Sequence, residues 1–507
     1  MARSRHIFAL LLTLILLVQC ATAPDQEAPE FAVEGDADSA LAVALRTSAR
    51  VDDIFSRVLL HTRIAEVYNE VGLLLPASEV LSGAVELARS ERAGAARAEI
   101  LVQVAVRYQE IDLTDRSRAL LREALDLARE IEDERVRVVV LQEVANASFI
   151  AGEELFDILI DALNQIYIVG DLRARVGLLV DVARQYQESG LGQQVDTLVQ
   201  HAISAATAIE NPWQKAAAYS SIAHRFAVAG NEDQSELFVR RALREIVGVE
   251  VLARSASEAA ELLTVADNLA AIGRFEEAER VLATIEFPVI RARGLAELGS
   301  RHLVEERYDE ADRLFDDAVN VVAAEGTEAQ FTEIVSDVAD RLAGAGRFDT
   351  ATANAEIALF IVDDVADDFT RIRILQRLAS VFIQVDRIDL AVEAAEALPD
   401  SDQRALLFVS LSKELLDLQQ PDDAVRFVAP AQRAADDVDA GSDEVFLELA
   451  TLYSRIGRYA DAIEQIDRVE SAFTRGLALV QLGRYSLLAG GLTDEERDRV
   501  ADLNPGR

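Results

Sequence analysis

The 507-residue sequence has very little cysteine, lysine, methionine or tryptophan, and each scarcity excludes a kind of structure. A single Cys rules out an internal disulfide and any metal site built from several cysteines. Lys215 and Lys413 are the only lysines, so nearly all of the 50 basic residues are Arg. With one Met, one Trp, nine Tyr and 19 Phe, packing must depend on Ala, Leu, Val and Ile.

Positive charge is scarce as well. Against 89 Asp and Glu stand 50 Lys and Arg, which gives a formal net charge of −39. Sequence-independent binding of nucleic acid needs a basic surface that displaces counterions, and attraction to anionic lipid needs clustered Lys or Arg. The composition therefore argues against both partners. Half of the residues are apolar, which is enough for more than one ordinary hydrophobic core.

Residues 1–19 have the pattern of a secretion signal. Arg3 and Arg5 precede an apolar run from Ile7 to Val18 that only Thr13 interrupts. The run is too short to span a bilayer comfortably and is typical of a signal peptide. No later stretch reaches eighteen apolar residues. Residues 20–38 are rich in carboxylates and contain two prolines, so we expect a flexible acidic tether.

Two ends of the signal are possible. Ala21-Thr22-Ala23 has the spacing of an ordinary cleavage site, although Pro24 would follow the cleaved bond unfavourably. Leu17-Val18-Gln19-Cys20 resembles the lipobox of bacterial lipoproteins, with Gln19 in place of the usual small residue. The resemblance implies that Cys20 becomes the lipidated first residue of the mature chain. Plain secretion, with Cys20 removed, and an uncleaved anchor remain as alternatives.

One pattern recurs twelve times along the chain, at spacings of 33 to 43 residues. Each unit has a small residue three positions before an anchor and an aliphatic residue four positions before it, which places both on one helix face. Ala recurs nine and sixteen positions after the anchor, on one face of a second helix. The anchors are Tyr68, Tyr108, Ser148, Tyr186, Phe226, Leu269, His302, Leu342, Phe382, Leu415, Tyr453 and Ser486.

Helix ends are marked within the same repeat. Four residues after eight of the anchors stands a Gly, which can adopt the left-handed backbone that ends a helix. These glycines are Gly72, Gly152, Gly190, Gly230, Gly273, Gly346, Gly457 and Gly490. Fifteen residues before most anchors stands a capping residue. These are Asp53, Asp133, Asp171, Asn211, Thr327, Asp367, Asp400 and Ser471. Each unit therefore reads as helix, tight turn, helix.

A basic residue recurs four positions after most of these caps. The positions are Arg57, Arg137, Arg175, Lys215, Arg371, Arg404 and Arg475. They could form a row of ligands for an acidic partner, or they could pair locally and against the previous unit. Because a feature repeated in most units serves the stack more readily than a ligand, we favour the local interpretation.

This set of positions resembles the tetratricopeptide repeat, in which small residues occupy three positions and an aromatic residue a fourth. The resemblance covers residues from about 50 to 490, although many units exceed the family's usual length and mostly lack its closing Pro. It implies an all-α fold, a right-handed α-α superhelix of about twelve helical hairpins. We expect this solenoid at 39–490, followed by a C-terminal cap or tail at 491–507. Stacked hairpins share one continuous core.

The resemblance also implies that the first helices line a concave face on which a partner protein or peptide docks. The candidate residues lie two before or one after the anchors. They are Glu66, Asn69, Gln109, Arg184, Gln187, His224, Asp267, Asp340, Lys413 and Arg484. The set is mixed in charge and does not resemble the Lys, Arg and Asn clamp that some family members use for a C-terminal carboxylate.

The sequence offers little for catalysis. The five His share no metal-ligand spacing, and His302 is expected to be a core or half-buried ring. The acidic runs at 363–368 and 436–439 lack the pattern of a calcium loop, so we interpret them as solvated junctions and helix caps. There is no phosphate loop, nucleophile elbow or dinucleotide fingerprint. We predict no metal, no cofactor and no enzymatic activity.

The sequence thus predicts a non-enzymatic protein-interaction scaffold. It is expected to be exported to the bacterial cell envelope, tethered to the membrane through Cys20, and to bind other proteins or peptides. Nucleic acid and small-molecule substrates are not expected. The alternatives are a soluble secreted or periplasmic binding module without lipid and, less favoured, an all-helical hydrolase.

Overall fold

A computed structural model of the chain describes residues 39–150, 172–188, 192–247, 255–438 and 442–503. The chain divides into two compact units, Met1–Ala32 and Val33–Arg507, and the described residues all belong to the second. The predicted signal peptide at 1–19, Cys20 and the tether at 20–38 lie outside the described residues. Gly152, Asp171 and Gly190 also lie outside them.

All regular structure within the described residues is helical, which confirms the predicted all-α fold class. The helices are α1 (Ala40–Ser48), α2 (Ile54–Glu70), α3 (Leu74–Ser90), α4 (Gly94–Glu110), α5 (Thr114–Arg129), α6 (Glu134–Ile150), α8 (Leu172–Glu188), α9 (Gly192–Ala208), α10 (Pro212–Val228), α11 (Glu232–Val247), α12 (Ala256–Ala271), α13 (Phe275–Leu282), α14 (Pro288–Val304), α15 (Tyr308–Glu325), α16 (Glu328–Gly344), α17 (Phe348–Ile361), a 3-10 turn η2 (Val362–Asp364), α18 (Asp368–Gln384), α19 (Ile388–Glu396), α20 (Ser401–Asp417), α21 (Pro421–Asp436), α22 (Asp443–Arg455), α23 (Tyr459–Arg468), α24 (Ala472–Leu488) and α25 (Asp494–Asp502).

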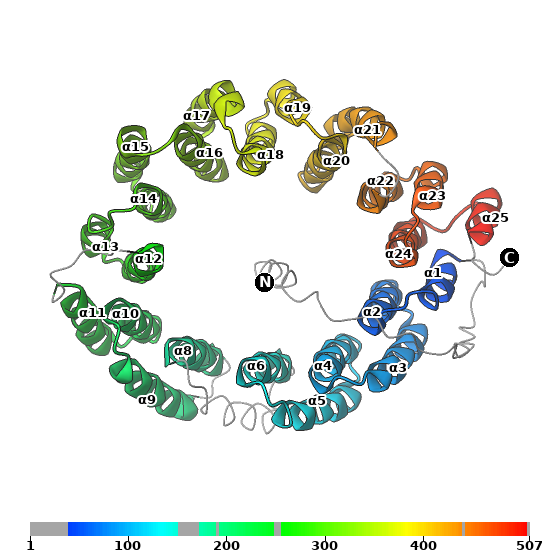
Figure 1. Cartoon of the computed structure of the whole chain (residues 1–507). Coiled ribbons are helices and arrows are strands. Elements are labelled where there is room, and N and C mark those ends of the chain that lie inside the picture. The colour runs from blue at the N-terminus through cyan, green and yellow to red at the C-terminus, as the bar shows by residue number, and fades with distance from the viewer. Residues whose placement is uncertain (1–38, 151–171, 189–191, 248–254, 439–441, 504–507) are drawn as a thin grey trace. The chain divides into compact units, whose positions relative to one another are not determined.

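The helices alternate between two layers. Every predicted anchor lies on an even-numbered helix from α2 to α24, so these are the first helices of the units. Each described second helix packs against its own first helix, and first helices of neighbouring units contact one another from α2 to α6 and from α8 to α24. Figure 1 shows the first helices as the inner layer and the second helices as the outer layer. The chain is thus a stack of tetratricopeptide-like helical hairpins, as predicted.

The positions predicted to be small line the core. The small residues three before the anchors, and the alanines that recur nine and sixteen positions after them, are buried. At Gly299 the reason is visible, because an added Cβ would lie 3.0 Å from the ring of Phe315 on α15. The small position on a first helix therefore receives a large side chain from the second helix of the same unit. His302, predicted to be core or half-buried, is buried with its ring centroid 4.3 Å from that of Phe275.

The turn between the two helices repeats with the same backbone geometry. In α2 the carbonyl of the anchor Tyr68 accepts a hydrogen bond from the amide of Leu73 at 2.8 Å, and Gly72 has a φ of 79°. This is a Schellman ending, which satisfies an orphan carbonyl through one left-handed residue. All of the predicted glycines that the structure describes have positive φ. Where a unit lacks Gly, the same position is still left-handed, as in Asp112, Glu306, Asp386 and Gln419.

These four residues give a direct test of the turn geometry. Because a side chain at positive φ is strained, Glu306→Gly should stabilise the protein by about 1 kcal/mol. Gly346→Ala, at the same position of the next unit, should destabilise it by a similar amount, since its φ is 75° and there is open space around it. Urea denaturation of both variants measures the effect. A loss of stability in Glu306→Gly would contradict the interpretation.

Most of the recurring caps and arginines serve the stack, as the favoured interpretation predicted. Asp367 accepts a hydrogen bond from the amide of Thr370 at 2.8 Å, and five further predicted caps accept equivalent bonds. Asp400 occupies the cap position without such a bond. Arg475 donates to the carbonyl of Val469, which lies in the preceding junction. Arg137, Arg371 and Arg404 likewise donate to junction carbonyls.

The two ends of the stack meet, which the sequence did not predict. Helix α1 packs against α24, and an added Cβ at Gly483 would lie 2.7 Å from the Cδ2 atom of Leu41. Gly483 is the small position of the twelfth unit, as Gly299 is of its own unit. Leu41 covers Gly483 in the same way that Phe315 of the second helix covers Gly299. The N-terminal helix α1 therefore fills the place of the second helix in the twelfth unit. Helix α25, within the segment predicted as a cap or tail, contacts α1 and α23.

The next first helix in this arrangement is α2. It contacts α24, where an added Cβ at Gly476 would lie 2.9 Å from the Cδ1 atom of Leu60. The carboxylate of Glu70 on α2 also accepts a hydrogen bond from Arg484 on α24 at 2.6 Å. We call this junction of α1 and α2 with α24 the closure seam. It gives the terminal units neighbours in place of exposed apolar faces.

Candidate interaction surface on the first helices

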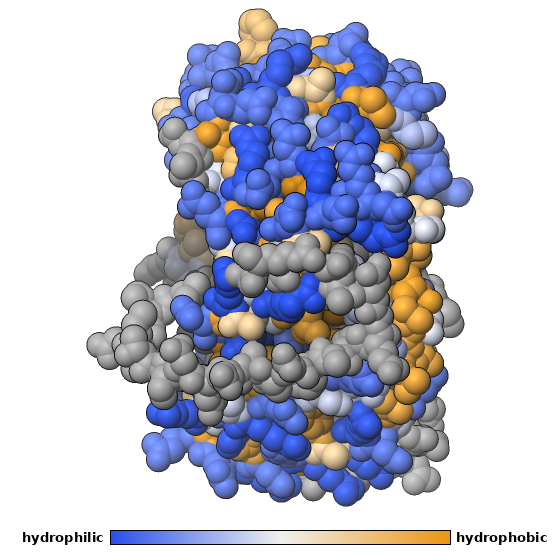
Figure 2. Space-filling view, turned by 90° about the vertical axis from the view of Figure 1, so that its right-hand side faces the viewer, coloured by the Kyte–Doolittle hydropathy of each residue, from blue (hydrophilic) through white to orange (hydrophobic). Residues whose placement is uncertain are grey.

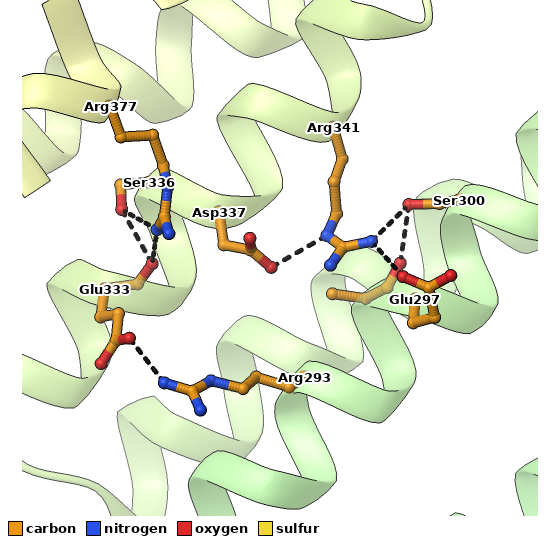
Figure 3. A network of polar contacts seen from close by, with 9 residues as sticks. Arg293, Glu297, Ser300, Glu333, Ser336, Asp337, Arg341 and Arg377 are labelled. Atoms are coloured by element: carbon orange, nitrogen blue, oxygen red, sulfur yellow. Dashed lines mark hydrogen bonds and ion pairs between the residues drawn. The ribbon is translucent and has the colours of Figure 1, made fainter. Parts of the chain in front are cut away.

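Glu333 joins three successive first helices. Its buried carboxylate accepts hydrogen bonds from Arg293 of α14 at 2.6 Å and from Arg373 of α18 at 2.8 Å. Its carbonyl accepts a further bond from Arg377 of α18 at 3.2 Å, and Figure 3 shows this carbonyl beside the hydroxyl of Ser336, which Arg377 also contacts. One acidic side chain thus ties α14, α16 and α18 together.

Arg341 forms a second centre in the same region. Its guanidinium donates to Glu297 at 2.7 Å and to Ser300 at 3.0 Å, both on α14. It also contacts Asp337, one turn earlier on its own helix, at 2.9 Å (Figure 3). Charge-assisted bonds of this kind are stronger than neutral ones and are directional, so they fix the register of neighbouring helices.

Similar contacts continue along the inner layer. Ser380 of α18 lies 2.9 Å from the carboxylate of Glu414 on α20, and Lys413 forms an ion pair with Glu448 on α22. In the other direction, Asn268 of α12 donates to Ser220 of α10 at 3.0 Å. We call these side chains, from α10 to α22, the inner polar surface. Its charges alternate in sign, and most of them pair between neighbouring units.

Two half-buried carboxylates on this surface form no ion pair with another described residue. Burial raises the pKa of Asp267 to about 6, the charge of Glu297 adds to the effect, and Arg301 opposes it. Burial also raises the pKa of Asp340, against the opposing charge of Arg377. A cationic side chain brought beside either carboxylate would stabilise its charged form and lower its pKa.

A third half-buried carboxylate, that of Glu143, lies on α6. Burial and the charge of Glu99 on α4 raise the pKa of Glu143 from its ordinary 4.5 to about 7. Because the unfolded chain releases this proton at lower pH, the folded state loses stability as pH rises from about 4.5 to about 7.

Glu143→Gln should therefore stabilise the protein above pH 7 and have little effect near pH 4. We expect a gain of about 1–2 kcal/mol at pH 8, after allowing for solvent screening of a partly exposed group. Urea denaturation of wild type and variant at both pH values measures it. An equal effect at both values would show that the charge of Glu143 is not responsible.

All ten predicted site residues lie on first helices. Glu66 and Asn69 lie on α2, Gln109 on α4, Arg184 and Gln187 on α8, His224 on α10, Asp267 on α12, Asp340 on α16, Lys413 on α20 and Arg484 on α24. The structure places several of them in two groups and uses two others for contacts between neighbouring units.

The larger group lies in the middle of the stack. His224 is half-buried, and burial lowers its pKa, as do the nearby charges of Arg301 and Arg184. Arg301 also acts on Asp267, so Arg184, His224 and Asp267 share one electrostatic environment. The smaller group lies near the closure seam, where Arg484 pairs with Glu70 and Glu66 lies 2.9 Å from Arg63.

Gln109 and Lys413 contact neighbouring units instead of standing free. The Gln109 amide donates to the hydroxyl of Ser117 at 2.9 Å and to the carbonyl of Ala147 on α6 at 3.1 Å. The sequence analysis also missed the residues that form most of the inner polar surface. A signal for them was present, since Arg stands directly before four anchors and an acid stands five before five anchors. These positions include Arg301, Arg341, Glu297 and Asp337.

This surface presents charged and amide side chains. Among the described residues, no three His, Cys, Asp or Glu side chains are grouped so as to hold a metal ion. None of the described helices combines the length and the apolar character needed to cross a membrane. What the surface offers is a row of half-buried charges and amides in fixed register.

Solved helical structures align with the chain at low sequence identity. A human IFIT1 dimer with m7Gppp-AAAA is 14% identical over 93% of this chain and 96% of its own, with a TM-score of 0.28. A Rap protein complexed with competence and sporulation factor is 14% identical over 68% of this chain and 98% of its own, with a TM-score of 0.25. Ton1535 from Thermococcus onnurineus NA1 is 17% identical over 82% and 99%, with a TM-score of 0.22.

At these TM-scores the three likenesses carry no argument about this chain. No protein-family model matches the sequence, and no curated protein is similar to it. The assignment to tetratricopeptide-like hairpins therefore rests on the helices, turns and small positions described above.

Proposed function

We propose that this chain is a non-enzymatic scaffold that binds a partner protein or peptide on the inner polar surface. The observation that supports it is the pair Asp267 and Asp340, two half-buried carboxylates without an ion-pair partner among the described residues. Their neighbours are paired across units. A partner with basic side chains would neutralise both carboxylates, and the chain's net charge of −39 would attract such a partner from a distance.

The second part of the proposal concerns location. The chain is exported to the bacterial cell envelope by its signal at 1–19 and held there by a lipid on Cys20, facing the periplasm or the exterior. The lipobox resemblance at Leu17 to Cys20 and the acidic segment that follows support this. A soluble secreted or periplasmic module without lipid is the alternative.

Cross-linking in the native envelope, followed by purification of the chain, tests partner binding. The partner recovered with wild type should fall about tenfold with Asp267→Asn combined with Asp340→Asn, because a desolvated ion pair carries much of an interface's energy. Asp363→Asn, at an exposed outer junction, is the matched control. Unchanged recovery from the double variant would exclude this surface. Substrate turnover by the purified chain, without a bound protein, would favour the hydrolase.

Metabolic labelling with a fatty acid tests the anchor. Wild type should incorporate the label and Cys20→Ala should not. If the label is absent from wild type, or persists in Cys20→Ala, the lipid anchor is wrong and the soluble module is favoured.

A further inference from the structure

Five exposed leucines gather at one edge of the closure seam. Leu73, Leu74 and Leu75 follow the end of α2, and Leu487 and Leu488 end α24, with exposed fractions from 39% to 79%. The two groups are about four hundred residues apart in sequence. The ion pair between Glu70 and Arg484 brings them together, since each of its members precedes one of the groups by three residues. We call these five residues the leucine edge.

Large exposed apolar clusters on soluble proteins mark contact surfaces. Figure 2 presents the side of the molecule on which α24 and α1 lie. Hydrophilic residues predominate on this face, and hydrophobic residues gather along one edge of it. The leucine edge exists only because the closure seam joins the two chain ends.

The N-terminal segment leaves the described structure beside this edge. An added Cβ at Gly483 would lie 3.5 Å from the backbone nitrogen of Leu41, so the first turn of α1 lies next to α24, one helical turn before Leu487. The chain that leads back from Ala40 to Cys20 therefore starts at the leucine edge. Nineteen residues lie between Cys20 and Ala40, a span of at most roughly 70 Å.

We propose that the leucine edge rests on the lipid bilayer in which Cys20 is anchored. This inference depends on the anchor in the proposed function. An anchored chain keeps the leucine edge close to the bilayer, which raises its effective concentration there. The leucine edge would contact the bilayer through apolar side chains. Because the chain has a net charge of −39, anionic lipid repels it, so the contact favours zwitterionic over anionic lipid.

A thiol-reactive, polarity-sensitive dye at Leu75→Cys tests the contact in the full chain. Cys20 is the only natural cysteine, so in the lipidated protein the introduced thiol is the only one that reacts. Phe360→Cys is the control, because Phe360 is 88% exposed at the far end of a second helix, away from the turns. Each labelled chain is added to phosphatidylcholine vesicles whose acyl chains carry bromine, which quenches only dyes that enter the bilayer.

Emission from the dye at position 75 should fall roughly twofold and that at position 360 should not change. If Cys20 proves unlipidated, the chain is labelled with Cys20→Ala added, and quenching at position 75 then means that the anchor fails and the leucine edge stands. If Cys20 is lipidated and position 75 is not quenched, the leucine edge is overturned and the anchor stands. Absence of both lipid and quenching overturns both.

Two other results would assign the edge to a protein and so overturn the proposal. A blue shift at position 75 that grows with protein concentration, without lipid, indicates a second copy of this chain. A blue shift in envelope extract, without quenching by vesicles, indicates another protein.

Discussion

Replacing Gly483 with valine is expected to open the closure seam. The added Cβ alone would lie 2.7 Å and 2.8 Å from the Cδ2 and Cγ atoms of Leu41, closer than packed carbon atoms approach, and the valine methyls would go further. Overpacking of this kind costs about 1–3 kcal/mol. Because α1 is only nine residues long, most of the cost should appear as release of α1 from α24.

Hydrogen exchange of the α1 amides, followed by mass spectrometry, measures this release. We expect protection of residues 40–48 to fall by about tenfold or more, since each 1.4 kcal/mol of local opening changes exchange tenfold. Gly177→Val is the matched control, because Gly177 also lies inside a first helix and no atom lies within 4 Å of its added Cβ. It should leave α1 protected.

A compensating substitution tests whether the steric clash with Leu41 is what releases α1. Leu41→Ala removes the atoms that the valine would strike, so in the Gly483→Val background it should restore part of the protection. If Gly483→Val alone leaves α1 as protected as in wild type, then α1 does not occupy the place of a second helix.

The hairpin repeat was predictable from sequence because the rules that make it are local. The left-handed turn at Gly72, the cap at Asp367 and the small residue at Gly299 are set by residues within one unit. The same rules hold where the motif residue is missing, as at Glu306, since the anchor carbonyl still needs its partner. Local agreement of this kind, repeated in each unit, specifies the stack.

The closure seam could not be predicted in this way. Gly483 fits the repeat as a small residue, but nothing near it in sequence indicates that Leu41 will cover it. Helix α1 precedes the first anchor, so the repeat assigned it no place. The contact depends on how far each unit rotates relative to the last, summed over the whole stack, and small positions do not encode that rotation.

The inner polar surface was predicted only in part for a related reason. All ten candidate residues lie on first helices, but Arg341 and Glu333, which join α14, α16 and α18, stand at other positions. Which turn of a first helix faces its neighbour is decided by the stacking geometry. The candidates Asp267 and Asp340 matter because they are left without ion-pair partners among the described residues.

Acid should weaken the closure seam through His61. This residue of α2 is buried, and its Nε2 atom lies 3.1 Å from the hydroxyl of Ser48, the last residue of α1. Burial, with a contribution from the charge of Arg57, lowers the pKa of His61 from 6.5 to about 4. The unfolded chain therefore binds a proton at a higher pH than the folded chain does. Stability supplied by the neutral ring is complete above pH 6.5 and is lost as pH falls toward 4.

The expected loss is about 2–3 kcal/mol between pH 8 and pH 4.5, from the size of this pKa difference. Many carboxylates titrate in the same range, so the measured quantity is the difference between wild type and His61→Leu in urea denaturation at each pH. His61→Leu lacks the bond to Ser48 and should be less stable at pH 8, yet it should lose less stability on acidification. His201→Gln, on an exposed position of α9, should follow wild type. If the stabilities of wild type and His61→Leu change with pH in parallel, then folding does not lower the pKa of His61. The closure seam would then not be weakened by protonation of His61.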